Sequence, residues 1–332
     1  MASLLDKRFL IFSGKGGVGK STVSAAVAVA AARRGKRVLI LEVGDQERMP
    51  SIFGARKAGY EGAKIYGSEK GPVAPIWSMC LTARESLHEF VLRQVKFERI
   101  YEAVFENRVI KYFTAAAPGL DELVIMGKIE NLASEKLAKP TKKQIAENGG
   151  EPPLRFDLIV MDAPATGHGL AFFKVPRMTM NMGKMGPLFR RSEKMWALIT
   201  DEQRTAFNIV TLPEEMPVNE SIDLHGAAKE LGLPPGKLIV NGVYPDLFEE
   251  DERALLDEVR AKAKPVEGIP GLIASSALEA ATAYRGRHDM QREMIERLDR
   301  ELKLDRFELP ALFRPRVSAE EVELLADHLE GF

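Results

Sequence analysis

The chain has 332 residues, 45% of them hydrophobic, so it can bury a sizeable core as one large domain or two ordinary ones. Its 47 Lys and Arg residues nearly balance its 48 Asp and Glu residues, and the formal net charge of -1 gives no positive field for nucleic-acid binding. The single cysteine, Cys80, excludes an internal disulfide and a zinc site made of several thiolates of this chain, which fits a reducing cytoplasmic location.

The N-terminal residues are not expected to act as an export signal. Residues 1–8 lack the charged, apolar and small-residue regions of a signal peptide. The sequence also contains no run of about 18 apolar residues, the minimum for a membrane-spanning helix. We therefore expect a cytoplasmic protein that does not insert directly into a membrane.

The first elements are predicted to be a strand, a glycine-rich loop and a helix. Residues 9–12 are apolar, and residues 21–34 are rich in alanine, which has a strong helix propensity. A second apolar run at 38–41 is followed by polar residues, the pattern of a strand buried on both faces of a parallel sheet. Similar strands are expected at residues 156–161, 206–212 and 237–243.

This alternation of strands and helices defines the expected fold class. Right-handed crossovers would give an α/β fold with a doubly wound, mostly parallel sheet, whose ligands bind at the carboxyl ends of the strands. No internal repeat is visible, so residues 1–332 are expected to form a single domain.

Insertions between the strands are expected to form a helical subdomain. Apolar and charged residues alternate at helical spacing over 84–110 and 120–137, which predicts a first insertion at about 82–137. A second insertion is expected at about 176–205. Residues 138–154, rich in Lys, Pro, Gly, Glu and Gln, predict an exposed, flexible loop. Two C-terminal helices are expected at 278–304 and 318–329, the latter opened by a capping box of Ser318 and Glu321.

The glycine-rich loop predicts a site for ATP and Mg²⁺. Its residues are Gly14, Lys15, Gly16, Gly17, Val18, Gly19, Lys20, Ser21 and Thr22. Backbone N–H groups of such a loop can surround phosphate oxygens where a helix begins, and the glycines permit the close approach. Lys20 is expected to reach the β- and γ-phosphates, and the Ser21 hydroxyl to coordinate Mg²⁺, which prefers hard oxygen ligands.

Other candidate site residues lie at or near the ends of strands. Asp162 closes an apolar strand and is expected to hold the water shell of the Mg²⁺ ion. Residues 163–170 are rich in glycine and proline and predict a switch loop beside the γ-phosphate. Asn241 is a candidate for reading the adenine edge, with a simple turn former as the alternative. Leu309 and Pro310 are candidates for an apolar wall against the base.

Together these motifs resemble the ArsA-type ATPases, the P-loop family that includes the catalytic subunit of bacterial arsenite pumps and the ATPase that delivers tail-anchored membrane proteins in eukaryotes. The resemblance rests on residues 14–21, the string Asp-Ala-Pro-Ala-Thr-Gly-His at 162–168, residues 118–122 and the pair Val240-Asn241. It covers nearly the whole chain.

The resemblance implies an ATP-driven dimer whose helical subdomains rearrange as the nucleotide is bound and hydrolysed. The second subunit would be another copy of the chain or an ArsA-type paralogue. In the family's deviant P-loop, the extra lysine crosses to the partner's nucleotide, so the resemblance gives this role to Lys15. A solvated loop lysine is the alternative.

Three departures from the family pattern limit what can be carried over. Arsenite-pump members bind the metalloid through several cysteines, and this chain has only Cys80. The paired Cys-x-x-Cys motifs of zinc-clamped members are missing. The family's water-orienting aspartate is replaced by Gly44, with Asp45 one residue later as a substitute only if the loop shifts.

The third departure predicts slow hydrolysis, because phosphoryl transfer depends on positioning and charge. A Gly44→Asp variant should raise turnover if the missing carboxylate limits the rate. The alternative is a nucleotide-gated scaffold or heterodimer subunit with negligible turnover, and an anion-pump motor is the least favoured option.

Five methionines follow the predicted switch loop: Met178, Met180, Met182, Met185 and Met195. Methionine clusters suit surfaces that bind varied apolar partners. A groove for a protein client on the helical subdomain is therefore one interpretation, and filling of the interface between the helical insertions and the core is the other. The period-two spacing of the first three weakens the groove interpretation, because they would not share one face of a helix.

Overall fold

The computed structural model describes residues 3–95, 119–164, 166–182, 187–262, 269–329 and 331–332. Its centre is an eight-stranded sheet of order β3-β4-β2-β5-β1-β6-β7-β8. The strands are β1 (Phe9–Ser13), β2 (Val38–Val43), β3 (Ala63–Tyr66), β4 (Ile76–Leu81), β5 (Leu158–Asp162), β6 (Thr205–Thr211), β7 (Pro235–Val243) and β8 (Arg306–Pro310). Every neighbouring pair is parallel except β3–β4. The predicted α/β fold class is confirmed.

The central strands are buried on both faces, as their apolar sequences predict. Along β1, Phe9 and Ile11 belong to one hydrophobic cluster, whereas Leu10 and Phe12 belong to a second cluster on the opposite face. This alternation follows from the two-residue period of a strand. The sheet therefore separates two cores, each covered by its own helices.

One core is covered by α1 (Lys20–Arg33), the short α2 (Met49–Ile52) and α13 (Ala319–Asp327). The 3₁₀ turn Leu4–Asp6 near the N-terminus also contributes Leu4 and Leu5 to this core. Small alanine side chains let α1 bury nearly its whole surface between the sheet and α13. The other core takes side chains from α6 (Leu120–Ser134), α8 (Thr166–Met182), α9 (Pro187–Thr200), α10 (Glu215–Glu230) and the C-terminal part of α12 (Ile269–Leu302).

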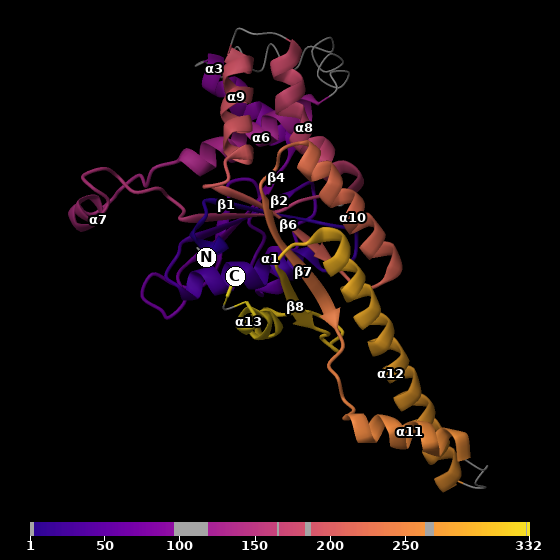
Figure 1. Ribbon diagram of the computed structural model, residues 1–332. Coiled ribbons are helices and arrows are strands. Elements are labelled where there is room, and N and C mark those ends of the chain that lie inside the picture. The colour runs from indigo at the N-terminus through magenta and orange to yellow at the C-terminus, as the bar shows by residue number, and fades with distance from the viewer. Residues whose placement is uncertain (1–2, 96–118, 165, 183–186, 263–268, 330) are drawn as a thin grey trace.

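A helical subdomain stands at one end of the sheet, drawn at the top of Figure 1. It consists of α3 (Ala83–Val95), α6, α8 and α9, which pack against one another. The expected helix over 84–110 is therefore present at least to Val95, and residues 96–118 lie outside the described residues. The expected helix over 120–137 ends at Ser134.

The segment after β5 differs from the prediction. Residues 163–170 were expected to form a loop because of their glycine and proline content, but α8 begins at Thr166 and takes in Gly167 and Gly169. Only the first residues of the predicted switch are therefore non-helical. Packing of α8 against α6, α9 and α10 outweighs the low helix propensity of the two glycines.

Residues 138–154 form an excursion from the body of the protein (Figure 1). Lys136 and Leu154 form an isolated antiparallel bridge at its base. Within the excursion, α7 (Lys142–Glu147) is opened by a capping box of Thr141 and Gln144 and buries no residue. The segment is thus exposed, as expected, but contains a helical turn, while its flexibility remains a prediction.

At the opposite end from the helical subdomain, α11 (Glu250–Lys262) and the N-terminal part of α12 project from the sheet (Figure 1). The expected helix at 278–304 begins earlier, at Ile269, and ends at Leu302. The capping box of Ser318 and Glu321 opens α13 as predicted. No helix within the described ranges is long and apolar enough to cross a membrane.

Candidate functional site

The glycine-rich loop connects the carboxyl end of β1 to the N-terminus of α1, and its backbone requires glycine at several positions. Gly14 has a φ of +154°, and a Cβ there would lie 2.1 Å from the carbonyl oxygen of Val210. Gly19 has a φ of +88° and is the N-cap of α1. Val18 is buried and anchors the loop in the core, whereas Gly16 and Gly17 are exposed. The loop therefore presents its backbone at a helix N-terminus, an arrangement that suits an anion.

Lys20, Ser21 and Thr22 form the first turn of α1. The Lys20 ammonium donates hydrogen bonds to the carbonyl oxygens of Gly14 at 3.0 Å and Lys15 at 2.8 Å, so this side chain curls back over the loop. Burial lowers the pKa of Lys20, partly offset by the negative charge of Asp162. Thr22 is half-buried beside them.

Ser21 and Asp162 meet directly behind the loop. The Ser21 hydroxyl donates a hydrogen bond of 2.5 Å to Asp162 Oδ2 at the end of β5. The other carboxylate oxygen, Oδ1, is buried and has no hydrogen-bond partner among the described residues. Burial raises the pKa of Asp162, while the hydrogen bond from Ser21 opposes this shift. A buried carboxylate oxygen without a partner is costly unless a ligand satisfies it.

These two side chains fit Mg²⁺, which takes hard oxygen ligands and usually keeps several waters and substrate phosphates in its shell. Within the described ranges, no group of three or more His, Cys, Asp and Glu side chains could hold a metal ion. A metal beside Ser21 and Asp162 would therefore need further ligands from a bound nucleotide and water.

Lys15 is half-buried, and its ammonium forms an ion pair with the carboxylate of Glu220 on α10. The contact lies within one chain. In this arrangement Lys15 points toward its own α10, and any role across a dimer would require this ion pair to break.

The segment that follows β2 has a defined shape around Gly44. Its φ is +121°, a backbone conformation that side chains with a Cβ rarely adopt. The Gly44 N–H donates to the carbonyl oxygen of Leu81 at 3.1 Å, and its own carbonyl oxygen accepts from the Cys80 thiol at 3.0 Å. A Cβ at Gly44 would meet no atom within 4 Å, and Asp45 is exposed. The constraint on Gly44 is thus its backbone conformation and not a lack of space.

Glu42 is a site residue that our sequence analysis missed. It lies in β2 in register with Asp162 of β5, and only 3% of its surface is exposed. Its carboxylate accepts hydrogen bonds from the backbone N–H groups of Arg48 at 2.7 Å and Met49 at 3.3 Å. Burial raises the pKa of Glu42 to about 7, and the two backbone hydrogen bonds oppose this rise. The available signal was a lone acidic residue inside an apolar run, Val-Leu-Ile-Leu-Glu-Val.

Asn241 and Pro310 lie near the carboxyl ends of the neighbouring strands β7 and β8, where Val243 pairs with Pro310. Asn241 Nδ2 donates to the carbonyl oxygen of Val18 at 2.9 Å, which fastens β7 to the glycine-rich loop. The Leu309 side chain is fully buried in the core.

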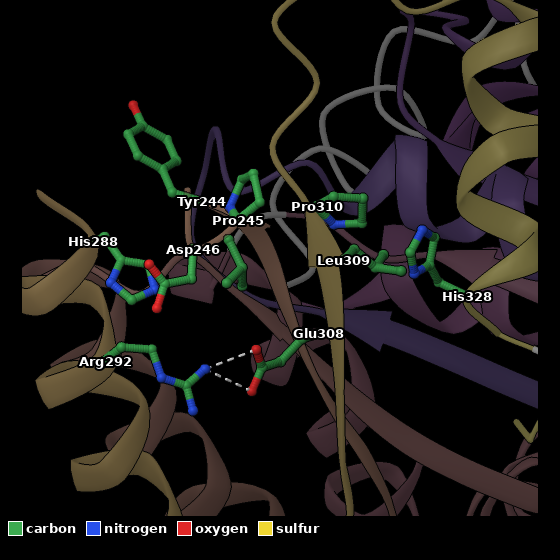
Figure 2. A pocket seen from close by; sticks show the side chains of 10 residues that line it. Tyr244, Pro245, Asp246, His288, Arg292, Glu308, Leu309, Pro310 and His328 are labelled. Atoms are coloured by element: carbon green, nitrogen blue, oxygen red, sulfur yellow. Dashed lines mark hydrogen bonds and ion pairs between the residues drawn. The ribbon is translucent and has the colours of Figure 1, made fainter. Parts of the chain in front are cut away.

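Pro310 lines a cavity of about 390 Å³, shown in Figure 2, that Asn241 does not line. An ion pair of 3.0 Å between Arg292 and Glu308 spans one side of this cavity. The full lining is Val243, Tyr244, Pro245, Asp246, His288, Arg292, Glu308, Leu309, Pro310 and His328.

With the loop, the Ser21–Asp162 pair and the parallel sheet in place, comparison with known families is decisive. The family described as anion-transporting ATPase, the ArsA ATPases, matches residues 7–189 and 181–269. The chain belongs to this family. The resemblance drawn from the sequence motifs is confirmed, and the protein is an ArsA-type ATPase.

Individual ArsA-family relatives extend over most of the chain. ATPase BagA of Mycobacterium tuberculosis is 28% identical over 92% of this chain and 87% of its own length. ATPase GET3B of Arabidopsis thaliana is 23% identical over 78% of this chain and 72% of its own. The arsenical pump-driving ATPase of Acidiphilium multivorum is 25% identical over 74% of this chain but only 41% of its own length.

Proposed function

We propose that this ArsA-family protein binds ATP with Mg²⁺ on residues 14–22, hydrolyses it slowly, and uses its nucleotide state to control the binding of a protein partner in the cytoplasm. The observation that carries the proposal is the pairing of Ser21 with Asp162 behind the loop, in which one buried carboxylate oxygen has no hydrogen-bond partner among the described residues. Family membership supports the ATPase activity itself.

The loop residues divide the work of holding ATP. Backbone N–H groups at the N-terminus of α1 surround the phosphates, and Lys20 exchanges its two carbonyl acceptors for β- and γ-phosphate oxygens. Ser21 and Asp162 would hold Mg²⁺, which would supply positive charge to the phosphate oxygens. Water attacks the γ-phosphorus, the bond to the bridging β,γ-oxygen breaks, and ADP and phosphate leave.

Slow turnover is proposed because no carboxylate stands at position 44 to orient the attacking water. Asp45, the nearest acidic residue in the chain, is exposed. For Asp45 to take over this role, the segment after β2 would have to shift from the conformation in which Gly44 bonds to Leu81 and Cys80.

The adenine is proposed to lie near the carboxyl ends of β7 and β8, within reach of Asn241 and against Pro310. Asn241 already contacts the loop through Val18, and Pro310 borders the cavity of Figure 2. The apolar wall is assigned to Pro310, with Leu309 beside it in the cavity lining although Leu309 is buried in the core.

A dimer, formed with a second copy or with an ArsA-type paralogue, is proposed to complete the site through Lys15. The family resemblance suggests this role. It requires Lys15 to leave Glu220 and reach the partner's nucleotide, so formation of the dimer would be coupled to rearrangement around α10.

The protein partner is proposed to bind the helical subdomain of α3, α6, α8 and α9. Of the methionines considered, Met178 is 60% exposed, Met180 is half-buried and Met195 is fully buried in the core. The side chains of Met182 and Met185 lie outside the described residues. Met178 and Met180 are therefore the methionines that would contribute to a client surface, and Met195 serves packing.

A second candidate function is a nucleotide-gated scaffold or heterodimer subunit with negligible turnover, which Gly44 favours. Steady-state ATP hydrolysis with Mg²⁺, together with the molecular mass by light scattering with and without a non-hydrolysable ATP analogue, separates the two. Slow turnover and an analogue-dependent dimer are expected. Tight analogue binding without measurable turnover would favour the scaffold.

A further inference from the structure

Arg48 is an exposed cation at the edge of the candidate site. It follows the segment of Gly44 and Asp45 and is the N-cap of α2. Its guanidinium makes no hydrogen bond or ion pair with any residue that the structure describes. In contrast, the carboxylates of Glu42 and Glu47 in the same segment accept hydrogen bonds from backbone N–H groups.

The backbone of Arg48 is nevertheless fixed from two sides. Its N–H donates to Glu42 Oε1 at 2.7 Å, and the next N–H, that of Met49, donates to Glu42 Oε2 at 3.3 Å. The Met49 side chain is fully buried in the same core as Val23 and Val27 of α1. Arg48 is therefore anchored to the end of β2 and to the helix that carries the glycine-rich loop, while its side chain stays available.

This anchoring places Arg48 beside the Ser21–Asp162 pair. Glu42, which holds the Arg48 N–H, lies directly across the β2–β5 ladder from Asp162. The Arg48 backbone is thus held at the same edge of the sheet as Asp162, one strand away.

We propose that Arg48 is a phosphate-binding residue that donates hydrogen bonds to the terminal phosphate of a bound nucleoside triphosphate. The proposal rests on the proposed function of the loop as an ATP site. A planar guanidinium can donate two parallel hydrogen bonds to a phosphate, which makes arginine well suited to this contact. Arg48 would supply a second positive charge besides that of Lys20. It would do so from the segment in which Gly44 replaces the family's water-orienting aspartate.

Glu42 has a positioning role in this arrangement. Its hydrogen bonds from the N–H groups of Arg48 and Met49 fix the backbone from which the Arg48 side chain extends. Contact with the terminal phosphate would also make the site prefer the triphosphate over the diphosphate, since ADP lacks the group that Arg48 binds.

The test compares the dissociation constants of a non-hydrolysable ATP analogue and of ADP, both with Mg²⁺, by calorimetry. Arg48→Ala should weaken binding of the analogue about 10- to 100-fold, the usual range for a lost hydrogen bond to a charged group, and leave ADP binding unchanged. Arg48→Lys should retain part of the affinity for the analogue. Arg56→Ala is the matched control and should change neither constant, because it removes another exposed arginine whose side chain makes no hydrogen bond or ion pair with a described residue.

Unchanged ADP affinity also shows that each variant is folded. If Arg48→Ala keeps the wild-type ratio of analogue affinity to ADP affinity, the role of Arg48 is wrong although the ATP site stands. An equal loss in Arg56→Ala would likewise overturn it, because a general charge effect would then account for the result. If the wild-type protein binds neither ligand, the proposed function fails and the role of Arg48 fails with it.

Discussion

At Gly44, the backbone conformation disfavours substitution, whereas the open space around the residue would permit a larger side chain. Its φ of +121° disfavours every residue with a Cβ, yet the space around it is open. The position therefore has room for the carboxylate that the family uses but lacks the backbone conformation that would carry it without strain. A substitution at Gly44 therefore introduces backbone strain together with any effect of the new side chain on ATP hydrolysis, and these two effects have to be measured separately.

A pair of variants makes that separation. Gly44→Ala and Gly44→Asp should both lower the free energy of unfolding by roughly 1–3 kcal/mol, the usual cost of a strained backbone. If the missing carboxylate limits hydrolysis, only Gly44→Asp should turn over ATP faster than the wild-type protein. Urea unfolding and steady-state hydrolysis check the two parts, and equal rates for the two variants would contradict the role given to the carboxylate.

Residue types identified most of the candidate site, because phosphate-loop chemistry has a compact signature. The loop, Lys20, Ser21 and Asp162, selected from their motifs, lie together in the structure, while their roles toward ATP and Mg²⁺ remain predictions. Glu42 was not predicted, since a glutamate in a buried strand has no recognisable motif, and its role depends on a loop that folds back onto it. The partner of Lys15 was also not predictable, because Glu220 lies far along the chain.

Individual elements follow their sequences to different degrees. The central strands were predictable because both of their faces are buried. β3 and β8 were missed because they are short outer strands with charged residues such as Lys64 and Arg306, which blur the apolar pattern. β4 was also missed, although it is largely buried, because no element was assigned between the expected strand at 38–41 and the helical insertion expected from about residue 82.

The capping boxes of α13 and α7 are expected to contribute differently to the global free energy of unfolding. α13 buries Val322, Leu325 and Ala326 and packs on α1, whereas α7 buries no residue. Ser318→Ala should therefore lower the global free energy of unfolding by about 1 kcal/mol, the typical cost of losing an N-cap. Thr141→Ala is the control and should leave it unchanged, since α7 can unfold locally. Equal effects in urea unfolding would show that the excursion at 138–154 is coupled to the core.

For the whole molecule, the ion pair of Lys15 with Glu220 opposes the proposed dimer. Both side chains are about a third exposed, so the pair contributes no more than about 1 kcal/mol. Glu220→Gln should release Lys15 and strengthen analogue-dependent dimerisation by up to about fivefold. Light scattering over a concentration series measures this, with Glu230→Gln on the same helix as the control. Weaker dimerisation in Glu220→Gln would indicate that Glu220 itself supports the dimer.

The central claim is that the loop 14–22 is an ATP site, and one titration tests it most directly. A non-hydrolysable ATP analogue with Mg²⁺ is titrated into the wild-type protein and into Lys20→Ala, with heat release as the readout. We predict one site per chain in the wild-type protein and no measurable binding in Lys20→Ala, because its ammonium is the cation placed directly over the loop. Undiminished binding by Lys20→Ala would contradict the account and place the nucleotide elsewhere on the molecule.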